Sequence, residues 1–498
     1  MSRGNPSMRR RADRPALSIA LVLASAAACG PSPTVDAVPS LGEALGEVSP
    51  RFLSFSLDSG ALAGFDFSRP ALRSLAEQLG PAYLRLGGTA SDQIFYDFSD
   101  APVGGPPAGY AKVLTRSVFD SACEFAAALE LEIVFTLNAG PGPRDPRGAW
   151  LPDNSRTLLE HARSIGCPIR VYELGHEING FVVVHGEAAY VSGSQYAADM
   201  SVARQLVESI APDARLAGPA SAFWPVLGET SPVLPEFLAA AGDQVDIVTW
   251  HYYPQQSSAC AVQSRPARRE TLLDPINLSE FLTWARHVEG LRDEHAPGAE
   301  VWLGETGHAL CNGEPGLSDR YLAGLWWVDQ LGMAARLGQP VTVRQTLAGG
   351  SVGLIDKDTL TPRPDYFNSL LWKRLMGQRA LSANLEELAS GSGIELVRAY
   401  SQCASDEYPK GAVTLLVINL GLQTVWVEWA EVEGPAQIFR LSSPDLISRK
   451  LWLNDVQLSV TAEGTVGAFV PVEDDLMELP PRSYGFVVLP EAGAAACS

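Results

Sequence analysis

The stretch Val171–Phe181 reads VYELGHEINGF and places an apolar run of strand-forming residues directly before a charged turn. A short apolar run that ends at Gly175 in this way is typical of a buried strand that leads into a loop. Two glutamates, Glu173 and Glu177, lie four residues apart around the turn. The zinc-protease pattern His-Glu-x-x-His is not completed, because Gly180 stands where its second histidine would be. The stretch therefore predicts no metal site.

Runs of the same kind occur along residues 51–376, and helical patterns separate them. This alternation predicts repeated βα units around a parallel sheet. Eight units fit an α/β fold, the (β/α)8 TIM barrel, which usually has about 250 residues. A doubly wound open sheet is the alternative, but no Gly-rich phosphate-binding turn follows the first run. The eight runs are FLSFSL (52–57), YLRL (83–86), EIVFTL (132–137), RVYEL (170–174), RLAG (215–218), DIVTW (246–250), VWLG (301–304) and VTVRQ (341–345).

The pattern changes over residues 377–498. Runs such as AVTLLVINL (412–420), TVWVEWAEV (424–432) and SYGFVVLP (483–490) are rich in strand formers and are separated by turn residues. No helical pattern of comparable strength accompanies them. The last part of the chain is therefore predicted to be an antiparallel β-sandwich.

The first residues have the features of a targeting segment. A basic start is followed by the apolar run Ala16–Ala28, which is too short to span a bilayer and predicts a signal peptide over residues 1–28. Cys29 follows three alanines, as at bacterial lipoprotein processing sites, and we expect it to carry the lipid. Residues 29–40 would then form a tether. The protein is expected to be exported as a cell-envelope lipoprotein, with simple secretion as the alternative.

The formal net charge of −20 argues against nucleic acid as a partner. We expect a monomer that contacts a membrane only through its lipid anchor, and the sequence indicates no cofactor. Six cysteines follow Cys29, and export would allow them to form disulfides. Six cysteines permit 15 pairings, and their spacing alone does not choose among these.

Polar and aromatic side chains follow the predicted barrel strands, at the end where barrel enzymes carry their active sites. Glu177 and Glu305 follow the fourth and seventh runs, which lie on opposite sides of an eight-stranded ring. Two carboxyl groups about 5–5.5 Å apart are what retaining glycoside hydrolysis needs. The pair therefore predicts a glycosidase in which one carboxyl group gives a proton and the other attacks the sugar.

Several long stretches resemble the heparanase family of retaining glycoside hydrolases. They are PAYLRLGGTASDQIF (81–95), VYELGHEINGF (171–181), DIVTWHYYP (246–254), VWLGETG (301–307) and SYGFVVLP (483–490), and the similarity covers most of the chain. The resemblance implies a barrel and a β-sandwich, with a strand from residues 41–50 joining the sandwich. It also implies hydrolysis of β-glucuronidic bonds, and hence a glycan substrate that contains anionic uronic acid.

The resemblance implies a role for each matching residue. Glu177 would be the acid/base and Glu305 the nucleophile, whereas Glu173 would point away from the site and be structural. Cys403 and Cys497 would form a disulfide. The residues implied to bind the sugar at the rim of the site are Asp58, Thr89, His251, Tyr253 and Gln345.

One departure from the family pattern touches the chemistry. His176 stands where the family has an asparagine that holds the 2-hydroxyl of the sugar, an interaction that strengthens in the transition state. A neutral imidazole can donate one hydrogen bond, so we expect His176 to bind substrate in its place. An imidazolium at this position would favour an ionised neighbouring carboxylate. A shifted pH optimum or an altered substrate is therefore expected.

Other departures concern the choice of sugar. Leu310-Cys311-Asn312 aligns with the Tyr-Gly-Gly that grips the uronate carboxylate in the family, which favours a neutral sugar. Arg268 lies in the basic loop QSRPARRE (263–270) after the sixth run, which favours an anionic sugar. A third alternative is a non-catalytic, glycan-binding surface protein. Cys260 lies in the same region as Cys311, and a disulfide between them is a separate hypothesis.

Overall fold

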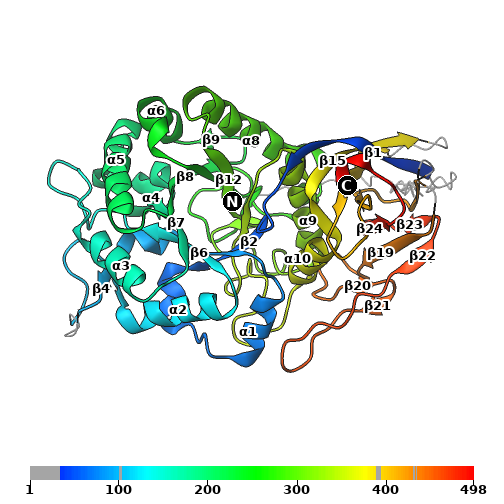
Figure 1. The fold of residues 1–498 in the computed structure, drawn as a ribbon, viewed down its shortest axis with the longest axis horizontal. Helices are drawn as coiled ribbons and strands as arrows, with labels where there is room; N and C mark the ends of the chain where they lie inside the picture. Colours follow the sequence, from blue (N-terminus) through cyan, green and yellow to red (C-terminus); the bar gives the residue numbers. More distant parts are fainter. Residues whose placement is uncertain (1–33, 100–103, 388–393, 430–431, 433) are drawn as a thin grey trace, which may run out of the picture. The chain divides into compact units, whose positions relative to one another are not determined.

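Eight parallel strands close into a barrel (Figure 1). The computed structural model describes residues 34–99, 104–387, 394–429, 432 and 434–498. The strand order is β10-β12-β14-β2-β3-β6-β7-β8, and pairing of β8 with β10 closes the ring. Each of the eight predicted runs forms one of these strands, which confirms the predicted barrel. Their bounds are β2 (Leu53–Asp58), β3 (Tyr83–Gly87), β6 (Glu132–Leu137), β7 (Ile169–Leu174), β8 (Arg215–Trp224), β10 (Ile247–Tyr252), β12 (Glu300–Thr306) and β14 (Thr342–Arg344).

The alternation of side chains along the strands separates two buried layers. Val134, Val171 and Trp302 pack with other residues into a small cluster contributed by successive strands. Their neighbours in sequence, such as Phe135 and Tyr172, belong instead to the large core shared with the helices. The small cluster faces the barrel interior. Because successive side chains of a strand point to opposite faces, the residue two positions after a member of this cluster faces the interior too.

Helices surround the barrel, and each barrel strand is followed by at least one of them. The helix α9 is buried along its length because it lies between the barrel strands and the C-terminal sheet. Among the described residues, no helix combines the length and the apolar character needed to span a membrane. The helices are α1 (Pro70–Glu77), α2 (Arg116–Ala128), α3 (Asp153–Ser164), α4 (Phe181–His185), α5 (Gly193–Ile210), α6 (Val233–Ala241), α7 (Arg269–Leu272), α8 (Pro275–His295), α9 (Tyr321–Arg336) and α10 (Pro364–Leu375).

Among the described residues, five further short strands lie outside the ring of barrel strands. The pair formed by β4 and β5 follows β3, β9 pairs with the end of β8, and β11 pairs with β13 at the ends of β10 and β12. Their bounds are β4 (Ile94–Asp97), β5 (Lys112–Thr115), β9 (Gly228–Glu229), β11 (Gln255–Gln256) and β13 (Ala309–Leu310).

The C-terminal strands and one N-terminal strand form a second sheet. In the part of the chain that the structure describes, this sheet has eleven strands, and β1 lies between β15 and β18. Figure 1 shows β1 beside β15. The strands are β1 (Thr34–Glu47), β15 (Met376–Glu387), β16 (Val397–Ala404), β17 (Val413–Asn419), β18 (Val425–Glu428), β19 (Ala436–Ser442), β20 (Trp452–Leu453), β21 (Val456–Gln457), β22 (Val472–Asp474), β23 (Met477–Leu479) and β24 (Ser483–Leu489).

The second sheet is continuous yet has two layers. Leu415 and Val417 of β17 pack with Val35 of β1 and Val427 of β18 in a core of their own. Residues of β17 between them face the opposite way and join the core of the barrel helices. One sheet therefore folds over itself and builds the two layers of the predicted sandwich.

The N-terminal strand begins earlier than expected. The prediction placed a tether over residues 29–40 and a strand over residues 41–50, but β1 begins at Thr34 and ends at Glu47. The second half of the predicted tether is therefore part of the sheet, because it pairs with β15 and β18. The signal peptide predicted over residues 1–28 and the lipid-bearing Cys29 lie outside the described residues.

Three disulfides are present. Cys403 is bonded to Cys497, the pair that the family resemblance implied, and Cys260 is bonded to Cys311, as in the separate hypothesis. The third disulfide joins Cys123 in α2 to Cys167, which precedes β7. The Cys123–Cys167 and Cys260–Cys311 bridges each join two parts of the barrel. The Cys403–Cys497 bridge joins β16 to the C-terminus.

Candidate active site

A buried arginine forms the floor of the site. Arg85 in β3 lies two residues after Tyr83, so its side chain faces the barrel interior. Its Nε and Nη2 atoms donate to Glu173 Oε2 of β7 over 2.9 and 2.7 Å, and Thr136 of β6 donates to the same oxygen over 2.8 Å. Burial alone would raise the pKa of Glu173, but the charge of Arg85 and these hydrogen bonds lower it. The floor is thus a paired ionic set with almost no exposed surface.

The same guanidinium reaches the predicted nucleophile. Arg85 Nη1 donates to Glu305 Oε2 over 2.7 Å, and the Tyr253 hydroxyl donates to Glu305 Oε1 over 2.6 Å. Burial would raise the pKa of the Glu305 carboxyl, but two histidine rings, the guanidinium and the tyrosine hydroxyl lower it below its usual range. Glu305 is therefore held as a carboxylate at the end of β12.

The second predicted carboxylate is presented by a strained turn. Gly175 adopts a φ of 74°, and a Cβ there would lie 2.4 Å from the Ile178 side chain. Glu177 itself adopts a left-handed φ of 51°, a conformation that costs a non-glycine residue roughly 1–3 kcal/mol and is frequent at functional sites. Its backbone N–H donates to the Ala220 carbonyl over 3.1 Å, and its side chain remains 14% exposed. The turn thus directs Glu177 toward solvent at the mouth of the barrel.

The two carboxylates meet, with two histidines between them. One side-chain nitrogen or oxygen from each of His176, Glu177, His251 and Glu305 lies within 4.8 Å of the others. His251 Nδ1 lies 3.0 Å from Glu177 Oε1, and the His176 ring lies 3.8 Å from Glu177 and 3.9 Å from Glu305. This spacing of carboxylate oxygens is compatible with the separation of about 5–5.5 Å between carboxyl groups in retaining glycosidases.

The same four side chains have the spacing of a metal site, but their surroundings do not favour a cation. Arg85 Nη2 lies 3.2 Å from His176 Nδ1 and 3.4 Å from His251 Nε2, so a positive charge already contacts both rings. Burial chiefly lowers the pKa of His176, and the charges of Glu177 and Glu305 act against this shift. Burial therefore disfavours the imidazolium beside the acid that the sequence left open.

A buried aspartate holds the turn that carries His176. Asp92 accepts the backbone N–H of His176 over 2.9 Å through one oxygen and that of Ala139 over 2.8 Å through the other. Burial raises the pKa of Asp92 to about 7. The carboxyl group therefore ties the loop after β6 to the loop after β7, which carries Glu177.

Asp58 and Thr89 lie together at the rim, beside Gly88. Gly88 has a φ of 99°, and a Cβ there would lie 2.7 Å from Asp58 Oδ2. Burial chiefly raises the pKa of Asp58, and the nearby Glu305 charge raises it further. Thr89 follows at the exposed start of a short helical turn.

The remaining two predicted residues do not join the carboxylates. Gln345 follows β14, and its side-chain oxygen accepts a hydrogen bond from Ser56 of β2. Arg268 is exposed, and among the described residues its backbone and not its guanidinium forms hydrogen bonds, with Gln255, Thr271 and Leu272. Its two neighbours in the basic loop are paired, because Arg265 contacts Glu280 over 2.6 Å and Arg269 contacts an aspartate over 3.8 Å. The predicted basic patch is therefore largely neutralised.

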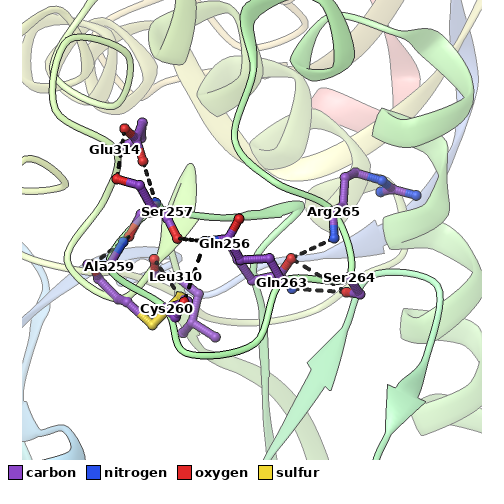
Figure 2. Close-up of a disulfide and its surroundings, with 11 residues drawn as sticks. Gln256, Ser257, Ala259, Cys260, Gln263, Ser264, Arg265, Leu310 and Glu314 are labelled. Carbon is purple, nitrogen blue, oxygen red and sulfur yellow. Dashed lines mark hydrogen bonds between the residues drawn. A yellow bond between two sulfur atoms is a disulfide. The ribbon is translucent and has the colours of Figure 1, made fainter.

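A cavity opens beside the acid/base candidate, and one wall of it is apolar. Gln256 and Leu310 belong to β11 and β13, which the Cys260–Cys311 disulfide holds side by side (Figure 2). Figure 2 shows Gln256 bonded to Ser264 and Arg265, so the loop after β10 is fastened at both ends. The lining residues are Glu177, Ala222, Phe223, Trp224, Pro225, His251, Tyr253, Gln256 and Leu310.

Two features of the site differ from the sequence prediction. Glu173 was expected to point away, but it faces the barrel interior and shares Arg85 with Glu305. Arg85 and Asp92 were not singled out at all. A signal for Arg85 was present, because an arginine within the apolar run YLRL has to find a buried partner.

Known proteins resemble this chain in sequence over most of its length. A family model described as "Glycosyl hydrolase family 79, N-terminal domain" matches residues 52–332. The chain is 31% identical to the heparanase of Gallus gallus, over 96% of this chain and 99% of that protein. It is 26% identical to the inactive heparanase-2 of Homo sapiens, over 90% of this chain and 87% of that protein.

A solved structure has the same fold. The 4-O-alpha-L-rhamnosyl-beta-D-glucuronidase from Fusarium oxysporum superposes with a TM-score of 0.65, covering 92% of this chain and all of that one. At 16% identity, this likeness concerns the fold alone.

Proposed function

Because the chain belongs to glycosyl hydrolase family 79, we propose that it cleaves β-linked uronic acid glycosides with retention of configuration at the anomeric carbon. The observation that carries this proposal is the approach of Glu177 and Glu305, whose carboxylate oxygens come within 4.8 Å of each other. A separation suited to a water molecule between the carboxyl groups, about 6.5–9.5 Å, would instead favour inversion.

The surroundings of the two carboxylates support different roles in a double displacement. Glu305 is the nucleophile, because Arg85 and Tyr253 hold it ionised and aimed at the centre of the barrel. Its oxygen attacks the anomeric carbon, and the bond to the leaving group breaks. Glu177, which is more exposed, gives its proton to the leaving oxygen and then takes a proton from the water that releases the sugar.

The charge around the sugar supports two candidate substrates. Lys112 Nζ lies 3.4 Å from the Gly60 carbonyl beside Asp58, and this exposed cation favours an acidic sugar. Two arginines of the loop after β10, Arg265 and Arg269, are paired with acidic side chains, and this pairing favours a neutral sugar. The acidic sugar is our first candidate and the neutral sugar the second.

A panel of 4-nitrophenyl glycosides tests the proposal. We expect the β-glucuronide to be hydrolysed faster than the β-glucoside and the β-xyloside, with the β-anomer as the first product in proton NMR. Glu305→Gln should lose at least about 1000-fold in kcat, because the nucleophile acts only in the transition state. Glu463→Gln, at an exposed loop position, is the control and should behave as the wild type.

Each outcome of the panel has one meaning. Faster hydrolysis of a neutral glycoside would favour the second candidate substrate. Equal rates for the wild type and Glu305→Gln would end the assignment of the nucleophile. Absence of turnover on every glycoside, together with binding of glycans, would favour a non-catalytic surface protein, in line with the relative named as inactive.

A further inference from the structure

We propose that the leaving-group side of the site takes an apolar aglycone and not a charged sugar chain. This inference rests on the proposed function, because it assumes that Glu177 protonates the leaving oxygen. The aglycone must then lie on the Glu177 side of the bond that breaks. The surface around Glu177 therefore decides which leaving groups are accepted.

The wall next to Glu177 is hydrocarbon. Ala222, Phe223, Trp224 and Pro225, at the end of β8 and just after it, line the cavity together with Leu310. Among the described residues that line the cavity there is no lysine and no arginine. Recognition of a sulfate or carboxylate relies on such cations for charge-assisted hydrogen bonds, so this wall has nothing to offer an anionic sugar.

Exposed apolar residues follow the cavity lining in two segments of the chain. After Glu177 the chain forms α4, in which three consecutive valines are exposed, and Val183 is 64% exposed. After Pro225 come Val226 and Leu227, which are 62% and 55% exposed. Single exposed apolar residues are ordinary, but we take these five, in the two segments that follow Glu177 and Pro225, as a binding surface.

The two parts of this surface are fastened to each other. Asn179, which precedes α4, donates to the Ala222 carbonyl over 2.8 Å and accepts the Ala222 N–H over 3.0 Å. This reciprocal pair joins the segment that carries the valines to the strand that carries the cavity wall. We call residues 182–184 and 222–227, with Leu310, the apolar wall.

The positive charge of Arg265 is already paired. Arg265 is paired with Glu280 over 2.6 Å, and the same glutamate accepts the backbone N–H of Val226 over 2.5 Å. The guanidinium therefore serves to hold the apolar wall in place and carries little free charge toward a substrate. Lys112, the exposed cation beside Asp58, follows a different part of the rim, after β4 and not after β7 or β8.

An alkyl series measures the contribution of the wall at constant leaving-group chemistry. Methyl, butyl and octyl β-glucuronides are compared, each below its micelle-forming concentration. We expect kcat/KM to rise about tenfold or more from methyl to octyl, because each buried methylene group adds favourable transfer free energy. Val183→Asp and Leu227→Asp should flatten this rise. Val456→Asp, at a valine 69% exposed on the C-terminal sheet, should keep it.

The outcomes separate the two proposals. Turnover of all three glucuronides at one rate would overturn the apolar aglycone and leave the proposed function standing. Absence of turnover on alkyl and aryl glucuronides alike would overturn the proposed function itself. A sulfated, heparan-type disaccharide hydrolysed faster than the octyl glycoside would overturn the apolar aglycone. So would binding to phosphatidylcholine vesicles that Val183→Asp abolishes, if the alkyl series is flat, because the wall would then face a membrane.

Discussion

The floor of the site and its apolar wall lie close together but differ in charge and in exposure. The side chains of Arg85 and Glu173 on the floor are 1% and 0% exposed, and each is fixed by the charge of the other. The wall consists of uncharged groups that are buried at Ala222 and Phe223 and exposed at the rim, where Val183 is 64% exposed. Buried charges need partners in fixed positions, whereas surface hydrocarbon needs only a similar shape.

This difference teaches which property each region can control. In the proposed mechanism the floor orients Glu305 and keeps it ionised, so we expect it to control the chemical step. The wall lies beside Glu177, so we expect it to control which leaving group is held. Substitutions on the floor should lower kcat and stability, and substitutions on the wall should change substrate preference.

Removing the guanidinium from the floor is expected to have the largest effect. Arg85→Met leaves Glu173 buried with only the Thr136 hydroxyl as a partner, so unfolding should become easier by about 3–5 kcal/mol. Turnover should fall by at least about 100-fold, because Glu305 loses a hydrogen bond as well. Denaturant unfolding and kcat measure the two effects.

A double variant and a surface control sharpen this test. Arg85→Met combined with Glu173→Met should recover much of the stability, since an apolar pair can replace a buried ion pair, but none of the turnover. Arg170→Met, at an exposed position of β7, should change stability by at most about 1 kcal/mol. A single Arg85→Met variant as stable as the wild type would mean that the floor is not the structural unit described above.

Removing one hydrogen bond to the nucleophile is expected to have an intermediate effect. The Tyr253 hydroxyl favours the charged form of Glu305 and thereby lowers the pKa of its carboxyl. Tyr253→Phe should raise that pKa, so protonation of Glu305 would stop catalysis at a higher pH. The acid limb of the kcat/KM profile should move up by about one pH unit. Tyr190→Phe, at an exposed tyrosine, is the control and should leave the acid limb in place. If the acid limb of Tyr253→Phe also stays in place, the limb reports the titration of a group other than Glu305.

The sequence carried enough information to predict the barrel and the approach of Glu177 to Glu305. Each barrel strand is a short apolar run between turns, and this local pattern is the one that the buried parallel strands retain. Glu177 and Glu305 each follow such a run, so counting strands was enough to place them across the ring. The early start of β1 was missed because Pro39 and Ser40 read as a linker, and pairing with strands more than 300 residues away overrides that local preference.

The partnership of Arg85 with Glu173 could not be read in the same way. The two residues lie 88 positions apart, and the tilt and stagger of the closed barrel decide which inward-facing side chains meet. Arg268 shows a second property that the sequence does not determine. Its charge suggested binding of an anion, but the sequence does not tell whether a loop side chain turns toward a cavity or toward solvent.

Loosening the wall without touching the floor is expected to have the smallest effect on turnover. The Cys260–Cys311 disulfide holds β11 against β13, and these strands supply Gln256 and Leu310 to the cavity (Figure 2). Replacing both cysteines by serine should raise KM for the octyl glucuronide by about threefold to tenfold and leave kcat within about twofold, because ground-state contacts are lost while Glu305 keeps its partners.

The disulfide between Cys123 and Cys167 provides a control of matched stability. It spans 44 residues where the first spans 51, so in the chain-entropy model the two losses of stability are nearly equal. It lies between α2 and the segment before β7, away from the residues that line the cavity. If both double variants raise KM alike, general loosening of the barrel explains the effect. If only the variant at 260 and 311 does so, the wall acts on the substrate independently of the floor, which is what the contrast between the two regions requires.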